Sequence, residues 1–329
     1  MEAAGHDFHT FPFFDAAAAA ILYQPGRLFK KVLGVMRGFW GRLKLTARIR
    51  QYDYIFIQRE ASPIGPPVFE WLWARVLRRK IIYDFDDALW IPSDSAANKI
   101  ATRLKAFWKI GSICKWAYVI VGGNNYLSDF GKKHARGGRV ITIPTVVDTV
   151  NRYDRLKAQD AQPLTIGWTG SHSTLPYLDA IVPVISRLQE ETDFTFLVIA
   201  DKRPDLPLKR WEFIPWNRET EISDLLRLNI GVMPLTADPW SEGKCGFKLI
   251  QYLSLGIPAV ASPVGVNPEI VDHGRNGYIA GNGPDWESYL KQLLGDAGAR
   301  DAMGRQGRTT IEAYYSLESC RSAFLSLFR

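Results

Sequence analysis

Short apolar stretches alternate with stretches of helical periodicity along the first half of the chain. The apolar stretches predict strands at residues 6–14, 52–58, 80–86, 118–122 and 139–144. The periodic stretches predict helices between them, most clearly at residues 67–79 and 97–116. This alternation is typical of a parallel sheet whose crossover connections are helices.

The second half restarts the same alternation after a polar, aperiodic stretch at residues 148–162, which predicts a linker. Strands are expected at residues 164–168, 194–200, 212–215, 230–234 and 259–262. Helices are expected at residues 175–192, 219–228, 247–255 and 286–294, and the tail from residue 302 to 329 is expected to be helical throughout. The sequence therefore predicts an α/β fold of two doubly wound, Rossmann-like domains that face a cleft.

Composition narrows the class of protein. Hydrophobic residues make up 47% of the chain and charged residues 23%, which is typical of globular domains. No apolar run is long enough for a transmembrane helix, and the first residues lack the basic start of a secretory signal. The cysteines, Cys114, Cys245 and Cys320, have no zinc or disulfide spacing, so we expect reduced thiols in a cytoplasmic protein.

The net charge of +7 is concentrated near the start of the chain. Residues 27–50 hold eight cations and no carboxylate, interleaved with apolar side chains that include Phe39 and Trp40. Such a segment is typical of an interfacial helix on anionic lipid, and the alternative is a solvated helix. No recognition motif for nucleic acid accompanies the charge, so nucleic acid is not an expected partner.

Two strand ends in the second half predict a diphosphate site. In "IGWTGSHSTLPYLD", Gly170 and Ser171 follow a strand and open a helix, whose free N–H groups suit a phosphate; an ordinary capped turn is the alternative. In "SEGKCGFKLIQYLSLGIPA", Lys248 supplies a point charge and Gln251, on the same helix face, suits a ribose hydroxyl. The alternative here is a solvated lysine with an incidental glutamine.

Two strand ends in the first half also hold charged residues. In "YDFDDALW", strand alternation separates Asp84 and Asp86 from Asp87, so we expect polar groups in the cleft and no metal site. In "IQREASPIGP", Arg59 either pairs with its neighbour Glu60 or meets an anionic acceptor.

The stretch "KCGFKLIQYLSLGIPAVASPVGVNPEIV" resembles the donor-site signature of family 4 glycosyltransferases, group 1 enzymes with the GT-B fold. "YDYIFIQRE", "KIIYDFDDALW", "IPTVVDT", "IGWTGS" and "GRTTIEAYYS" follow in that family's order. The resemblance implies that the C-terminal domain holds a nucleotide-sugar donor and the N-terminal domain a glycan or lipid-linked acceptor. It also implies that the last helix crosses back to the first domain, that transfer retains the anomeric configuration, and that no cofactor is needed.

The resemblance assigns roles to individual residues. The expected catalytic residues are Asp86, Lys248, Lys244 and Glu242. The expected donor-binding residues are Gly170, Ser171, Lys244, Gly246, Phe247, Lys248 and Gln251, and Arg59 and Asp87 are expected on the acceptor side. The family's usual pair of glutamates is replaced here by Gly243 and Gln251, and Asp86 stands where many members have a histidine.

The expected domains are residues 1–155 on the acceptor side, residues 156–305 on the donor side, and a helix at residues 306–329 packed on the first domain. The first strand of the family's N-terminal domain has no counterpart in the sequence. The expected function is glycosyl transfer in the synthesis of a bacterial cell-surface polysaccharide or glycolipid, on the inner face of the membrane. The alternatives are a non-catalytic protein that binds sugar nucleotides, or a nucleotide-sugar epimerase.

Overall fold

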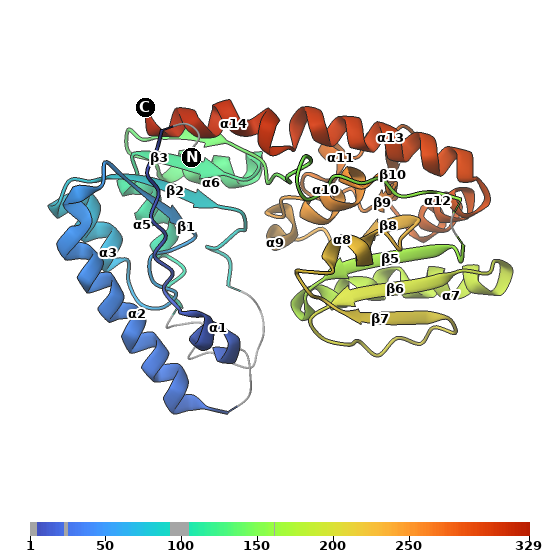
Figure 1. Cartoon of the computed structure of the whole chain (residues 1–329), viewed down its shortest axis with the longest axis horizontal. Helices are drawn as coiled ribbons and strands as arrows, with labels where there is room; N and C mark the ends of the chain where they lie inside the picture. Colours follow the sequence, from blue (N-terminus) through green and yellow to red (C-terminus); the bar gives the residue numbers. More distant parts are fainter. Residues whose placement is uncertain (1–4, 23–25, 93–104, 161) are drawn as a thin grey trace. The chain divides into compact units, whose positions relative to one another are not determined.

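The computed structural model describes residues 5–22, 26–92, 105–160 and 162–329. Its contacts divide the chain into two compact units. Unit 1 holds residues 1–143 together with Ser322–Arg329, and unit 2 holds Pro144–Arg321 (Figure 1). The prediction that the end of the chain returns to the first domain is confirmed, although only the last residues belong to unit 1.

Unit 1 is built on a four-stranded sheet in which every strand is parallel to its neighbours. The strands follow one another in space as they do in sequence: β1 (Tyr54–Gln58), β2 (Lys80–Phe85), β3 (Val119–Gly122) and β4 (Arg139–Thr142). The connections contain α3 (Val68–Trp71), the π-helical η3 (Leu72–Val76), α5 (Lys109–Trp116) and α6 (Asn125–His134). Because right-handed crossovers in a sequential order cover only one face of a sheet, the other face needs a different cover.

The end of the chain supplies that cover. Leu327 is fully buried with Ile82, Val119 and Val121, and Phe324 packs against the same cluster. The strand register places the three sheet residues on one face. These contacts come from α14 (Leu317–Leu325) and the short 3-10 helix η5 (Ser326–Phe328), which end beside β2 and β3 (Figure 1).

The helices α1 (Ala16–Leu22) and α2 (Leu28–Arg48) precede β1, and α2 ends in the short 3-10 helix η2 (Ile49–Gln51). α2 runs beside α3 on the outside of unit 1 (Figure 1) and contacts it through the rings of Phe39 and Phe69. Three positions of α2 are buried, namely Gly34, Gly38 and Arg42. They recur every fourth residue, so only a narrow stripe of this helix packs on the unit.

Unit 2 is built on a six-stranded parallel sheet with the order β10-β9-β8-β5-β6-β7. The strands are β5 (Thr165–Gly170), β6 (Thr195–Ala200), β7 (Trp211–Pro215), β8 (Ile230–Met233), β9 (Ala259–Ala261) and β10 (Gly277–Ile279). The helical segments are the 3-10 helix η4 (His172–Ala180), α7 (Val182–Glu191), α8 (Glu221–Leu225), α9 (Pro239–Glu242), α10 (Phe247–Ser254), α11 (Asn267–Ile270), α12 (Gly283–Gly295) and α13 (Ala297–Tyr314).

Both faces of the second sheet are buried. Alternate residues of the central strand β6 belong to two different cores: Phe196 and Val198 to one, Leu197 and Ile199 to the other. α7 and α12 cover the first core, and α10 and α13 contribute to the second. Burial on both faces explains why the strands β6, β8 and β9 are mostly apolar in the sequence.

The structure corrects several sequence expectations. No strand forms at residues 6–14, where the carbonyl of Phe11 instead accepts a hydrogen bond from Arg42 Nη1 at 2.9 Å. The helix expected at 175–192 is interrupted at Ile181 between η4 and α7, and the expected tail helix is divided by a β-bridge between Val147 and Ser316. Of the helix expected at 97–116, residues 97–104 lie outside the described part, and α5 begins at Lys109. The sequence did not predict β10, whereas α6 lies between two predicted strands, where a helix was expected.

Leu327→Ala should lower the free energy of unfolding by about 2–5 kcal/mol, because it leaves a cavity against the second face of the first sheet. Urea unfolding monitored by circular dichroism measures this change. Leu317→Ala is the matched control, since Leu317 is 49% exposed in α14 and should lose little. Equal losses for the two variants would show that the C-terminal residues do not form part of the core of unit 1.

Candidate functional site

The strand order of unit 2 reverses beside β5. The chain runs from β5 outward through β6 and β7, then returns to the other side of β5 with β8 and continues through β9 and β10. β5 and β8 pair in parallel, with Ile166 opposite Ile230, so their carboxyl ends open at the same edge. In doubly wound sheets, ligands bind beyond the carboxyl ends of the strands at such a reversal.

The first loop at this edge follows β5. Gly170 ends the strand and Ser171 caps η4 in a reciprocal arrangement, in which the Ser171 N–H donates to Thr174 Oγ1 at 3.2 Å. The buried ring of Trp168 packs directly on this backbone, because a Cβ added at Gly170 would lie 2.3 Å from it. The cap fixes where the helix begins and leaves its first turn at the carboxyl edge of the sheet.

The second loop follows β8 and leads into α10. Gly246 precedes the helix with a φ of 67°, a left-handed conformation that favours glycine. A Cβ at this position would also lie 2.2 Å from Ile270 Cδ1. In the first turn of α10, Lys248 Nζ lies 5.5 Å from the centroid of the Trp168 ring. The structure therefore brings Gly170 and Lys248, which are distant in the sequence, to the same ring.

Other predicted donor residues lie on the same loop after β8. Glu242 ends α9, and Lys244 Nζ lies 4.7 Å from the centroid of the Trp240 ring. The hydroxyls of Ser241 and Tyr177 are 3.0 Å apart and connect α9 with η4. Cys245 is buried, and Phe247 is 42% exposed at the start of α10.

Gln251 has partners inside the unit. Its side chain is 3% exposed, and Nε2 donates to Tyr153 Oη at 2.8 Å and to Glu221 Oε1 at 3.2 Å. Glu221 also accepts hydrogen bonds from Arg152 and Trp216. These bonds give the amide a structural role that the sequence did not indicate, and its contact with a ribose stays a prediction.

His172 and Asp201 form a pair that the sequence did not predict, since His172 was expected to be an ordinary loop residue. Asp201 follows β6 at the carboxyl edge, and its Oδ2 lies 2.6 Å from His172 Nδ1. The Asp201 Oδ1 also accepts from the His172 N–H at 2.5 Å. Desolvation opposes ionisation of Asp201, but the hydrogen bonds from His172 hold its pKa below the usual value. The position of Asp201 directly after a predicted strand was the available signal.

In unit 1, Arg59 connects the carboxyl ends of β1 and β2. Its Nε donates to Asp86 Oδ1 at 2.9 Å and its Nη2 to Asp87 Oδ2 at 2.6 Å. The backbone of Arg59 has a φ of 65°, which is strained for a residue with a side chain. The expectation that Arg59 could pair with Glu60 is wrong, because Glu60 Oε2 lies 2.5 Å from Lys109 Nζ instead.

Asp84 lies within the same strand end. Burial raises the pKa of Asp84 to about 7, the carboxylate of Asp86 raises it as well, and Arg59 lowers it. Among the described residues, no group of three or more histidine, cysteine or carboxylate side chains is arranged to hold a metal ion. Asp84, Asp86 and Asp87 form a cluster with Arg59 at this strand end, and such a cluster is suited to hydrogen bonds with hydroxyl groups.

Asp84→Asn should flatten the pH dependence of stability. In the native protein the Asp84 carboxyl group keeps its proton up to about pH 7, whereas in the unfolded chain it loses the proton near pH 4. The free energy of unfolding therefore falls as the pH rises between these two values. The wild type should lose up to about 1.4 kcal/mol per pH unit relative to the variant between these values. Urea unfolding at pH 5 and pH 8 measures the difference.

The control for this experiment is Asp193→Asn, because the Asp193 side chain is 92% exposed. It should keep the pH dependence of the wild type. If Asp84→Asn also keeps that dependence, the carboxyl group of Asp84 does not have a raised pKa in the native protein.

Comparison with known proteins identifies the fold and finds a family model that matches part of the chain. A family model described as "Glycosyl transferases group 1" matches residues 163–296, which contain the edge of β5 and β8. No curated protein matches the sequence. Sucrose-phosphate synthase from Thermosynechococcus elongatus superposes with a TM-score of 0.69 at 14% identity, over 93% of this chain and 81% of that one.

Two further solved structures are similar. HepE from Anabaena in complex with UDP gives a TM-score of 0.64 at 14% identity, over 87% of this chain and 81% of that one. A glycosyltransferase from Rickettsia africae gives 0.64 at 13% identity, over 87% and 79%. The predicted GT-B fold is confirmed. A glycosyl transferases group 1 model thus matches residues 163–296 of the chain, and the chain as a whole has the GT-B fold.

Proposed function

We propose that the chain is a glycosyltransferase, which moves a sugar from a nucleotide-diphosphate sugar, held by unit 2, to a glycan or lipid-linked acceptor, held by unit 1. The observation that carries the donor half is the shared edge of β5 and β8, where two helix starts and Lys248 gather around Trp168. HepE was solved with UDP and also with UDP-glucose, so UDP is the first nucleotide to test.

The chemistry follows from the charge that develops when the bond between sugar and diphosphate breaks. The leaving diphosphate gains negative charge, and preorganised cations and N–H groups stabilise that charge better than water does. Lys248 and Lys244, with the N–H groups of η4 and α10, fill this role. Glu242 and Asp86 are the residues proposed to act at the sugar, and the transfer proceeds with retention of configuration.

The acceptor half rests on the cluster at the carboxyl edge of unit 1. The guanidinium of Arg59 bridges Asp86 and Asp87 and so orients both carboxylates. Carboxylates held in this way accept hydrogen bonds from sugar hydroxyls, and the arginine suits a phosphate on a lipid-linked acceptor. Synthesis of a cell-surface polysaccharide or glycolipid is the role that fits these chemistries.

Two features of unit 2 favour a second candidate function. Gln251 donates to Tyr153 and Glu221, and Gly243 replaces a carboxylate expected beside the sugar, so the unit is compatible with a protein that binds sugar nucleotides without catalysis. Release of UDP from UDP-glucose, measured with and without added acceptor glycans, separates the two. An active-site variant such as Asp86→Asn should lower the rate only if the chain is an enzyme.

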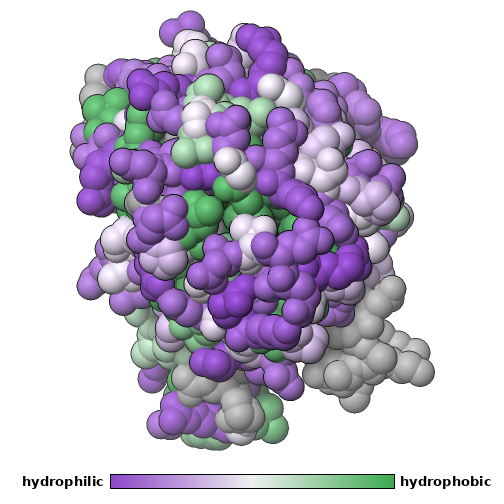
Figure 2. All heavy atoms as spheres, turned by 90° about the vertical axis from the view of Figure 1, so that its right-hand side faces the viewer, coloured by the Kyte–Doolittle hydropathy of each residue, from purple (hydrophilic) through white to green (hydrophobic). Residues whose placement is uncertain are grey.

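We also propose that α2 binds an anionic membrane surface. Its outward face exposes large apolar side chains: Leu28 (75%), Phe29 (80%), Met36 (62%), Trp40 (59%) and Leu43 (52%). In contrast, hydrophilic residues cover most of the side of unit 2 that faces the viewer in Figure 2. A helix with an exposed apolar stripe and only cations beside it is suited to the headgroup region of anionic lipid.

The structure divides the cations of α2 by role. Arg42 is 8% exposed, and it donates through Nε to the Ala61 carbonyl at 2.7 Å and through Nη1 to the Phe11 carbonyl. These hydrogen bonds of Arg42 hold α2 against unit 1, so this side chain cannot contact lipid. Lys30, Arg37, Lys44 and Arg48 are exposed and are available to headgroups. No described helix combines the length and apolar character needed to cross a bilayer, so the proposed contact is peripheral.

Lys248→Ala should raise the dissociation constant for UDP about tenfold or more, because one cation of the diphosphate site is lost. The dissociation constant for uridine, which has no phosphate, should stay within about twofold. Isothermal titration calorimetry measures both, with Lys209→Ala as the control, since Lys209 pairs with Glu190 on the surface. Equal losses for UDP and uridine would reject the phosphate role, and a wild type that binds no nucleoside diphosphate would reject the donor site.

The chain should sediment with vesicles that contain phosphatidylglycerol and not with vesicles of phosphatidylcholine alone. Changing Arg37, Lys44 and Arg48 to Gln should weaken this binding strongly, at about 1 kcal/mol for each cation. The control changes Arg187, Lys209 and Lys291 of unit 2 to Gln, which removes the same charge elsewhere. If both triple variants sediment like the wild type, α2 is a solvated helix.

A further inference from the structure

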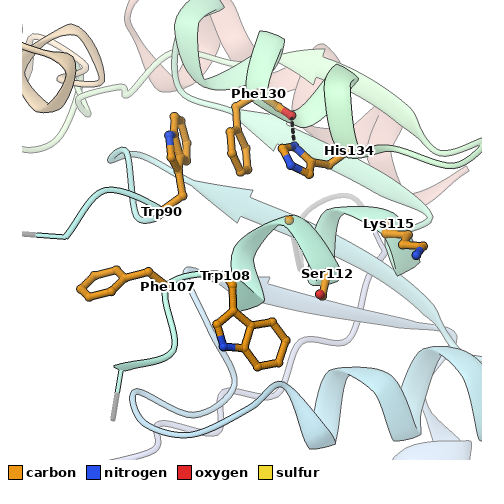
Figure 3. Close-up of a pocket in the computed structure, with 8 residues that line it drawn as sticks. Trp90, Phe107, Trp108, Ser112, Lys115, Phe130 and His134 are labelled. Atoms are coloured by element: carbon orange, nitrogen blue, oxygen red, sulfur yellow. Dashed lines mark hydrogen bonds between the residues drawn. The ribbon is translucent and has the colours of Figure 1, made fainter. Parts of the chain in front are cut away.

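Unit 1 contains an open pocket of about 400 Å³ between α5 and α6. Figure 3 shows its two walls: Trp90, Phe130 and His134 on one side, and Trp108, Ser112 and Lys115 on the other. The volume is large enough for one or two sugar rings. The described side chains that line the pocket are aromatic or polar, and none is aliphatic.

One aromatic wall of the pocket is held in place by ring stacking, and the other is an exposed indole. The rings of Trp90 and Phe130 stack at 3.7 Å with 5° between their planes, so each holds the other in place. On the opposite wall, Trp108 is 63% exposed and makes no ring contact with another described residue. Phe130 is already stacked on Trp90 and packed against His134, so the flat surface available to a ligand is the exposed indole of Trp108.

The polar groups of the pocket suit hydroxyls. The Nδ1 of His134 lies 2.9 Å from the Phe130 carbonyl, which can only accept, so Nδ1 carries the proton and Nε2 is left to face the pocket. Gly111 makes room for this ring, because a Cβ there would lie 2.7 Å from His134 Cδ2. Ser112 Oγ, on the opposite wall, both donates and accepts.

One cation, Lys115, stands at the rim of the pocket, and no carboxylate is among the described residues that line it. These described residues offer no aliphatic wall to an acyl chain, and a cationic ligand would meet the like charge of Lys115. We propose that this pocket binds a sugar ring that bears a carboxylate, stacked on Trp108 with Lys115 at its charged group. The inference rests on the proposed function, for which it defines the acceptor as an acidic glycan.

The test measures glycan binding directly, without donor or membrane. A hyaluronan tetrasaccharide, which carries glucuronate, is the acidic probe, and chitotetraose is the neutral probe. Saturation-transfer NMR detects contact with the protein, and titration of tryptophan fluorescence gives the dissociation constants. The acidic probe should bind more tightly, and Trp108→Ala should raise its dissociation constant about tenfold. Lys115→Gln should remove the preference for the acidic probe.

The control is Trp71→Ala, since Trp71 is 47% exposed in α3 of the same unit and does not line the pocket. It should bind like the wild type, and UDP binding by Trp108→Ala should also be unchanged. Absence of binding for both probes, or tighter binding of decanoate than of either glycan, would overturn the inference while leaving the donor site intact. Equal binding of both probes would overturn the assignment of an acidic sugar. Loss of UDP binding in the wild type would instead overturn the proposed function.

Discussion

Parallel pairing of every strand is the constraint on which both units depend. Because parallel strands share one carboxyl edge, the loops after β5, β6 and β8 must meet at one side of unit 2, and those after β1 and β2 at one side of unit 1. The reversal beside β5 then selects a position along the edge of unit 2. This strand order brings together two loops that are distant in the sequence. Their predicted donor residues are Gly170 and Ser171 after β5, and Lys244 and Lys248 after β8.

The two sheets differ in which segments of the chain cover their faces. In unit 2 the reversal of strand order supplies helices to both faces, and the strands β8 and β9 are buried along their whole length. In unit 1 the strands run in sequential order, so the crossovers cover one face and the far end of the chain covers the other through Phe324 and Leu327. The stability of unit 1 is therefore coupled to residues that lie almost two hundred positions beyond its last strand.

Much of this arrangement could be predicted from the sequence, because buried parallel strands are apolar runs and helices follow a clear period. Tertiary contacts decided the remainder. The aromatic stretch at residues 6–14 alternates like a strand but has no partner strand, and its Phe11 carbonyl bonds Arg42. Gln251 has the spacing of a ligand contact, yet its amide is buried against Tyr153 and Glu221. The pair of His172 and Asp201 depends on the neighbouring positions of β5 and β6, which no local pattern reveals.

The most direct test of the central claim is amide hydrogen exchange in the presence and absence of UDP. The account predicts that UDP slows exchange at residues 169–174 and 244–251, which flank the carboxyl ends of β5 and β8, and leaves the exchange of β1 to β4 unchanged. Protection confined to unit 1, or protection in unit 2 away from these two loops, would contradict the assignment of the donor to the β5–β8 edge.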